Sequence, residues 1–453
     1  MTPSDLDSDV RNERGLVRQL SSVQQTTMAL GGAIGTGLFL ASGLAVNVAG
    51  PAVIVSTVIV AGLSLLLGRA LSEMAVAHPT AGAFGVYAGM YVSPFAGYAV
   101  RASYWLMEVI ATGAQLVAVS LYMASWFPQV HGAVWVLAFG AALVFINSRA
   151  VGQLGTVEYW LVVVKVVALL LFIGLAVLLL VGATGEPAIG LSNLTAGGGF
   201  MPFGAKGVWL GCCLVIYSFI GVEIVGVTSG EAADPARTIP RAMRRMVFGL
   251  SAIYILATAL LTALTPWQQP GAGGGVAGSP FVTVLVKLGI PAAAGVMNFV
   301  VLTAALSSAN ANLYLISRTL FSLSRAGFVP RSLGSVSSRG APIIALLVSC
   351  LGLGAAALIY AKWPDSAFQK LFGVALFGAL FVWLMIFVTH IRFRRTSRPL
   401  GSYAGAALVT AILISTWWVP GLGSTLLTAV PWLVLLAIGY FASRRWPATS
   451  ASH

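Results

Sequence analysis

Charged residues are scarce in this chain. Only 8% of its 453 residues are Asp, Glu, Lys or Arg, whereas 58% are apolar. A soluble domain has about 25% charged and about 45 to 50% apolar residues. The 12 acidic and 25 basic side chains are too few to solvate the surface of a soluble protein of this length. We therefore expect the chain to lie in a lipid bilayer.

Alternation between apolar and polar residues is also missing from the apolar runs. A transmembrane β-barrel needs stretches of about ten alternating residues, but residues 166–181 form one continuous apolar run. Residues 341–360 contain no charged side chain, and about 20 apolar residues suffice for a membrane-spanning helix. The sequence therefore predicts an all-α polytopic membrane protein.

Clusters of catalytic or metal-binding side chains are absent from the sequence. The three cysteines lie inside apolar runs without ligand or disulfide spacing, and the four histidines are scattered: Cys212, Cys213, Cys350, His78, His131, His390 and His453. No His-x-x-x-His or paired-acid motif is present. We expect no enzyme activity, no metal site and no cofactor. The basic residues lie between apolar runs, which argues against nucleic-acid binding despite the net charge of +13.

About twelve apolar spans can be distinguished, beginning near residues 24, 52, 94, 132, 154, 205, 239, 291, 341, 367, 402 and 422. An even number places both termini on one side. The loops on that side hold 18 of the 25 basic residues: Arg11, Arg14, Arg18, Arg149, Arg237, Arg241, Arg244, Arg245, Arg318, Arg325, Arg331, Arg339, Arg392, Arg394, Arg395, Arg398, Arg444 and Arg445. The other side has Lys206, Lys362 and Lys370 near its span ends. Because Lys and Arg resist translocation, both termini are predicted to be cytoplasmic.

Two spans contain weak points at corresponding places. The first has four glycines in its middle, Gly31, Gly32, Gly35 and Gly37, and the sixth has a second weak segment at residues 217–226. Paired interruptions of this kind are typical of inverted-repeat transporters with a binding site at the membrane midplane. The alternative is that the glycines only allow close helix packing.

The chemistry of two broken helices favours an amino acid as ligand. A half-helix that starts near Gly35 to Gly37 presents free N–H groups and a positive dipole end, which attract a carboxylate. Exposed carbonyl groups at the other broken ends attract an ammonium group. These two features match the two ends of an amino acid.

An ordered set of motifs resembles the amino-acid permeases of the amino acid, polyamine and organocation superfamily. The segment Gly-Gly-Ala-Ile-Gly-Thr-Gly-Leu-Phe at residues 31–39 is similar to their first-helix signature. Further similar segments are residues 69–74, 79–84, 158–160, 165–166, 218–226, 230–232, 239–242, 309–314, 317–320 and 326–330. The resemblance extends from about residue 17 to residue 395.

This resemblance implies a LeuT-like fold and uptake of amino acids across the cytoplasmic membrane. A ten-helix core at residues 24–395 would consist of two inverted five-helix repeats, at about 24–182 and 205–395, with broken first and sixth helices. Two additional C-terminal helices would occupy residues 396–446. Residues 1–23 and 447–453 would be cytoplasmic tails.

Lys165 is the clearest ionisable residue inside a span. It lies eleven residues after the predicted start of its helix, about 16 Å into the bilayer and close to the midplane. Desolvation disfavours a charged amine there, so Lys165 can exchange a proton. By resemblance, it occupies the place of the sodium ion of sodium-coupled relatives, which implies coupling to protons and no sodium. A permanently charged lysine paired with a buried carboxylate is the alternative.

The resemblance also assigns the other site residues. Glu223, at the break of the sixth helix, is tied to proton sensing or cation recognition, and we favour proton-linked gating. Tyr217 would be an aromatic flap over the substrate. The remaining substrate contacts would be the carbonyls of Ala33 and Ile220, donors from Gly35, Thr36 and Gly37, and the side chain of Asn312, where most permeases have serine.

Three further polar positions stay open at this level. Glu108 lies seven residues from Arg101, and we favour an internal ion pair over a substrate role. Arg69 and Glu73 are four residues apart near a helix end and are interpreted as a structural pair. Asn310 either lines the cavity or forms an interhelical hydrogen bond.

The sequence thus predicts a proton-coupled symporter of a neutral amino acid, with the lipid bilayer as its surroundings. An amino-acid exchanger, a permease for cationic amino acids or 4-aminobutyrate, and, more distantly, a channel are the alternatives. The substrate side chain and the oligomeric state are not readable from the sequence.

Overall fold

The computed structural model describes residues 22–80, 82–148, 151–183, 187–232, 234–268, 281–282, 285, 291–337, 341–364, 366–419 and 421–443. The predicted terminal tails lie almost wholly outside these ranges. The same is true of seven basic residues used for the orientation: Arg11, Arg14, Arg18, Arg149, Arg339, Arg444 and Arg445.

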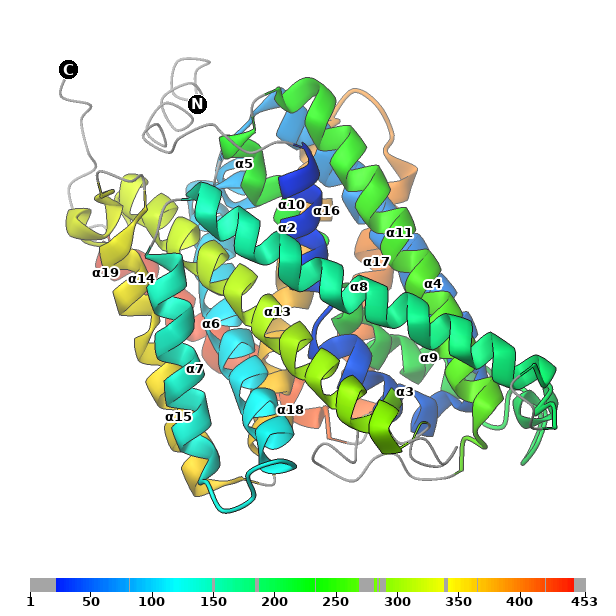
Figure 1. The fold of residues 1–453 in the computed structure, drawn as a ribbon. Helices are drawn as coiled ribbons and strands as arrows, with labels where there is room; N and C mark the ends of the chain where they lie inside the picture. Colours follow the sequence, from blue (N-terminus) through cyan, green and yellow to red (C-terminus); the bar gives the residue numbers. More distant parts are fainter. Residues whose placement is uncertain are drawn as a thin grey trace.

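All extended regular elements in the described residues are helices (Figure 1). The first half contains α2 (Ser22–Ala33), the short turn η1 (Gly37–Ala41), α3 (Ser42–Ala49), α4 (Val53–Ala77), α5 (Ala83–Tyr91), α6 (Pro94–Ala124), α7 (Gly132–Asn147) and α8 (Val151–Val181). The second half contains α9 (Gly204–Val215), η4 (Ile216–Phe219), α10 (Ile224–Val227), α11 (Pro235–Leu264), α13 (Pro291–Arg325), α14 (Ile343–Ser349), α15 (Leu351–Lys362) and α16 (Ala367–Phe393). The last helices are α17 (Leu400–Ser415), α18 (Gly423–Leu427) and α19 (Ala429–Ser443). The all-α prediction is confirmed.

Ten helical segments in the described ranges are long and apolar enough to cross a membrane. Two shorter apolar helices, Ala29–Phe39 and Gly132–Asn147, accompany them. The first two predicted spans are divided differently from our expectation, because α3 and α4 follow one another as a single apolar stretch, Ser42–Ala77. The count of twelve therefore stays a prediction.

Burial separates an inner group of helices from an outer group. In the central stretches of α6 and α13, 83% and 89% of the residues are buried, and the segment Gly204–Gly230 is 89% buried. The corresponding values for α17 and α19 are 28% and 17%. In Figure 1, α6 and α13 cross the middle of the bundle and pack against each other. The two C-terminal helices α17 and α19 are therefore peripheral.

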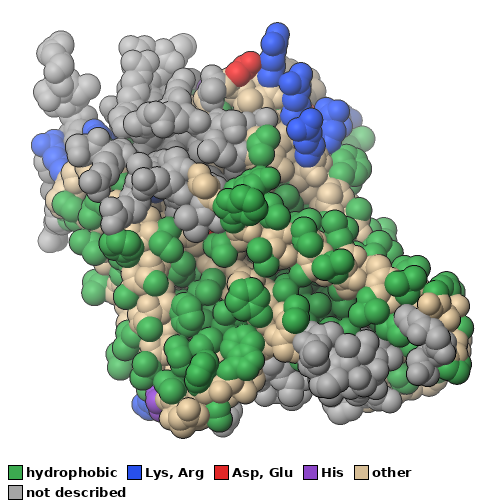
Figure 2. All heavy atoms as spheres, viewed as in Figure 1, with side chains coloured by type: hydrophobic (Ala, Val, Ile, Leu, Met, Phe, Trp, Pro, Cys, Tyr) green, Lys and Arg blue, Asp and Glu red, His purple; other side chains and the backbone are tan. Residues whose placement is uncertain are grey.

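The outer surface has the character of a membrane protein. Figure 2 shows apolar side chains spread over the flank of the molecule, with Lys and Arg gathered mainly at one end. Large apolar side chains such as Leu171, Leu358 and Leu400 are exposed on different helices. An exposed apolar surface of this extent requires lipid as its solvent.

Candidate functional site

The two interrupted helices meet at the centre of the molecule. One interruption separates α2, which ends at Ala33, from η1, which begins at Gly37, and the other separates η4 from α10. A Cβ atom on Gly37 would lie 2.9 Å from Ser218 Cα, and one on Gly221 would lie 2.8 Å from Ala33 N. Glycine is therefore required where the two broken segments touch.

Lys165 binds the end of the first broken helix. Its side chain is completely buried, and Nζ donates hydrogen bonds to Gly31 O at 2.7 Å and to Ile34 O at 2.9 Å. The last carbonyl groups of a helix have no partners within the helix and form the negative end of its dipole. An ammonium group at this place completes their hydrogen bonding and opposes the dipole.

The two carbonyl groups between these acceptors are also hydrogen-bonded by side chains. Ser308 Oγ donates to Gly32 O at 2.9 Å, and the Tyr254 hydroxyl donates to Ala33 O at 2.8 Å. Four successive carbonyls of the break, from Gly31 to Ile34, thus accept bonds from other helices. Ala33 O, predicted to face a substrate ammonium, also accepts a hydrogen bond from Gly35 N at 3.1 Å, so both of its lone pairs are used in this conformation.

Gln115 lies where a substrate carboxylate is predicted. Its Oε1 accepts a long bond of 3.4 Å from Thr36 N, and its Nε2 donates to Ser308 Oγ at 3.0 Å. The N–H group of Thr36, which the sequence analysis predicts to bind the substrate carboxylate, therefore donates to a neutral amide oxygen in this conformation. Sequence reasoning missed Gln115 because it lies on a different helix, α6, and carries no recognisable motif.

Glu223 closes the second interruption. Both carboxylate oxygens accept from Gly221 N, at 3.1 and 3.2 Å, and Oε2 also accepts from Trp383 Nε1 at 3.1 Å. Gly221 has φ of +110°, a conformation that side-chain-bearing residues rarely adopt. Glu223 is buried and holds the irregular backbone in place, while Trp383 connects it to α16.

A small cavity lies between the two interruptions. It measures about 30 Å³, and its lining residues include the predicted Ala33, Gly35, Gly37, Tyr217, Ile220 and Asn312, together with Glu108, Gln115 and Ser308. Ligand pockets usually have about 300 to 1,000 Å³. The cavity is too small for an amino acid in this conformation, so a substrate fits only if the surrounding helices move apart.

Tyr217 covers one side of this cavity. Its ring lies against that of Phe372, with the centroids 4.1 Å apart and an angle of 37° between the planes. The contact connects the second broken helix to α16. This placement is consistent with the flap role, which itself stays a prediction.

Two of the open polar positions now have defined surroundings. Glu108 lines the cavity, together with Gly221, the residue whose N–H group donates to Glu223. Its predicted ion pair with Arg101, two helical turns away, stays untested. The Arg69 and Glu73 pair is confirmed, with Arg69 Nε 3.2 Å from Glu73 Oε1.

A buried polar network adjoins the site, and sequence reasoning did not recognise it. Glu158 accepts hydrogen bonds from Ser307 Oγ and, at 2.7 Å, from Asn310 Nδ2, whose Oδ1 accepts from Asn147 Nδ2 at 2.8 Å. Asn310 therefore bridges helices, whereas Asn312 faces the cavity. A Cβ on Gly31 would lie 1.9 Å from Glu158 Oε1, so Glu158 also touches the first break. Its spacing of seven residues from Lys165 was the available signal, since that spacing puts both on one helix face.

Similarity to known proteins extends over nearly the whole chain. The family model for amino acid permeases matches residues 24–450. The uncharacterised amino acid permease YtnA of Bacillus subtilis is 34% identical over 95% of this chain and 96% of its own length. The aromatic amino acid transport protein AroP of Escherichia coli K12 is 35% identical over 97% of this chain and 98% of its own. AroP of Salmonella typhimurium LT2 is 34% identical over 99% and 100%.

Proposed function

The chain belongs to the amino acid permease family, and from this premise we propose that it imports a neutral amino acid across the cytoplasmic membrane in symport with a proton. Membership establishes a multi-pass membrane protein for amino acid transport, not an enzyme. The coupling ion, the substrate class and the direction are the substance of the proposal. No cofactor and no sodium ion take part in it.

Lys165 is the observation on which the coupling proposal rests. Its amine is buried against carbonyl groups of the first interruption, Gly31 O and Ile34 O. Hydrogen bonds from a charged donor are about twice as strong as those between neutral groups. Loss of the proton weakens the attachment of α8 to the broken helix, and gain of the proton restores it. Proton binding and the position of the first break are thereby coupled.

The substrate proposal rests on the two ends of the cavity. Backbone donors at Gly35, Thr36 and Gly37 would bind the carboxylate once Thr36 N is released from Gln115 and Gly35 N from Ala33 O. The carbonyls of Ala33 and Ile220 and the side chain of Asn312 would complete the contacts. Because the named AroP relatives transport aromatic amino acids, phenylalanine, tyrosine and tryptophan are the first neutral substrates to test. Glu223 would couple proton binding to closure through Gly221.

Two inverted five-helix repeats, at about 24–182 and 205–395, would explain why the interruptions face each other. In this arrangement the broken helices are equivalent elements of the two repeats. Both chain termini are placed in the cytoplasm, following the distribution of Lys and Arg.

A second candidate is transport of a cationic amino acid. Glu108 lines the cavity, and Glu223 binds Gly221, which also lines it, so two carboxyl groups lie close to the substrate region. A lysine or arginine side chain would be complementary to such a pair. Competition between labelled phenylalanine and unlabelled arginine distinguishes the two candidates.

The decisive experiment is uptake by proteoliposomes that contain the purified protein. Labelled neutral, aromatic and cationic amino acids are compared with and without an inward proton gradient, for the wild type, Lys165→Ala and Lys206→Ala. Lys206 is an exposed lysine at the start of α9, outside the site, and is the matched control.

We expect gradient-driven accumulation by the wild type and by Lys206→Ala, and none by Lys165→Ala. Counterflow with substrate preloaded inside should persist in Lys165→Ala, because exchange does not require net proton movement. A merely structural lysine would lose both activities together. Uptake that requires preloaded amino acid in the wild type and ignores the gradient would make the protein an exchanger, and ionic currents without saturation would make it a channel.

A further inference from the structure

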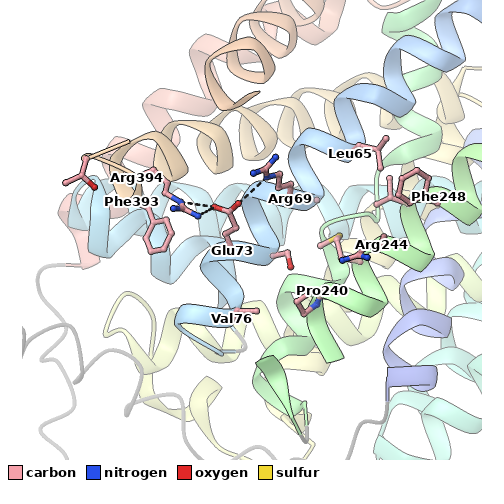
Figure 3. Close-up of a pocket in the computed structure, with 14 residues that line it drawn as sticks. Leu65, Arg69, Glu73, Val76, Pro240, Arg244, Phe248, Phe393 and Arg394 are labelled. Carbon is pink, nitrogen blue, oxygen red and sulfur yellow. Dashed lines mark hydrogen bonds and ion pairs between the residues drawn. The ribbon is translucent and has the colours of Figure 1, made fainter. Parts of the chain in front are cut away.

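A second, larger cavity lies away from the broken helices. It measures about 850 Å³ and lies between α4, the first turns of α11 and the end of α16 (Figure 3). No residue of its lining belongs to the lining of the small central cavity. Its volume is in the range of ligand pockets. The proposed transport path does not use it.

Positive charge exceeds negative charge in this cavity. Arg69, Arg244 and Arg394 line it, together with one acidic residue, Glu73. Glu73 binds Arg69 at 3.2 Å, Arg394 at 2.7 Å and His390 at 3.0 Å, so this carboxylate is shared among three groups. In the part of the chain that the structure describes, Arg244 has no ion pair. The lining therefore has a net positive charge and one arginine available for an anion.

The other walls of the cavity are apolar and extend into the membrane. Helix α4 runs toward this end of the molecule, so Leu65 lies about 16 Å deeper than Val76. Phe248, one turn after Arg244 on α11, is 57% exposed and lies at the same edge as Leu65 in Figure 3. The arginine side chains and the apolar wall are thus arranged in sequence along the membrane normal.

We propose that this cavity binds an anionic phospholipid. Its phosphate contacts Arg244, with Arg69 and Arg394 nearby, and one acyl chain lies against Leu65 and Phe248. Basic pockets between membrane helices on the cytoplasmic side are suited to such headgroups, and this end is the one that the distribution of basic residues places in the cytoplasm. A soluble anion has no apolar part to contact Leu65 and Phe248, and a lipid without net charge does not neutralise the positive charge of the lining. The inference is independent of the transported substrate and of the coupling ion.

Native mass spectrometry of the purified full-length protein tests this assignment. Retained adducts are measured after addition of phosphatidylglycerol, of phosphatidylcholine with the same acyl chains, and of inorganic phosphate. The variants are Arg244→Gln, which removes the available charge, and Leu65→Trp, which narrows the apolar part without changing charge. Arg245→Gln is the matched control, because the neighbouring Arg245 is exposed and outside the lining.

The wild type and Arg245→Gln should retain phosphatidylglycerol in preference to the other two probes. Arg244→Gln should retain about five-fold less, the factor that one basic residue near an anionic membrane surface contributes. Leu65→Trp should lose the adduct while its melting temperature stays close to that of the wild type.

Three results would overturn the assignment. The first is equal losses in Arg244→Gln and Arg245→Gln, which would indicate general surface attraction. The second is equal retention of phosphatidylcholine or of free phosphate. The third is phosphatidylglycerol binding that appears only after deletion of residues 1–21, which would make the N-terminal segment the occupant of the cavity.

Discussion

At the scale of single residues, two asparagines on α13 illustrate how position decides role. Asn310 and Asn312 are two residues apart, so they point in different directions from the same helix. Asn310 donates to Glu158 and accepts from Asn147, whereas Asn312 lines the central cavity. The sequence could not separate them, because neighbouring helices determine which side faces the cavity.

Asn310→Ala should destabilise the protein without directly altering substrate preference. The substitution removes partners from two buried polar side chains, each at a cost of about 1 to 3 kcal/mol. We expect a clearly lower melting temperature in detergent solution. An unchanged melting temperature would show that the network adds little to stability.

Asn312→Ala should alter transport and leave stability nearly unchanged. We expect a melting temperature close to that of the wild type and a KM for the preferred amino acid changed by about two- to ten-fold, the effect of one hydrogen bond. Uptake at varied substrate concentration measures this change, with Asn310→Ala as its counterpart on the same helix. If Asn312→Ala had the same KM as the wild type for every amino acid tested, Asn312 would not belong to the substrate site.

At the scale of elements, the interruptions of the first and second broken helices depend on each other. The carbonyls at the end of α2 are held by side chains from α8, α11 and α13, and Gly221 lies directly against Ala33. Neither interruption is stable alone, because unsatisfied backbone groups at membrane depth cost several kcal/mol each. Movement of one break therefore requires movement of the other.

Gly221→Ala should abolish uptake. Its φ of +110° is unfavourable for alanine, and the added Cβ would approach Ala33 N to 2.8 Å. Gly190→Ala is the control, since Gly190 also has positive φ, +66°, but nothing lies within 4 Å of its Cβ position. Gly190→Ala should cost about 1 to 2 kcal/mol of backbone strain and leave transport intact. Wild-type uptake by Gly221→Ala would contradict the close contact of the two breaks.

At the scale of the whole molecule, two features stand out: the central cavity is small, and arginine side chains gather at one end of the helix bundle. The deeply buried α6 and α13 surround a cavity too small for an amino acid. Arginines at the start of α11 and after α16 lie at one end, where Pro240 and Arg394 line the same pocket. Transport then requires opening toward each side in turn.

Impermeant maleimide labelling of intact cells measures the orientation. In a Cys350→Ser background, Lys206→Cys should be labelled from outside, and Arg241→Cys should be labelled only after permeabilisation. Cys212 and Cys213 should not react, because both are fully buried. The reverse pattern would place the termini outside the cell.

The sequence by itself determined that the protein lies in lipid, that it is helical and where two helices break. Composition decides the surrounding solvent, and glycine spacing weakens a helix locally. It also singled out Lys165 and Glu223, since an ionisable group in an apolar run is costly wherever the run packs. Only the tertiary structure decided that Lys165 binds the carbonyls of the first break and that Glu223 binds Gly221 and Trp383. The roles of Glu158 and Gln115 were recognised only in the tertiary structure, because their hydrogen-bond partners lie on segments that are distant in the sequence. A hydrogen bond between helices depends on how they pack, and a pattern along one helix does not contain that information.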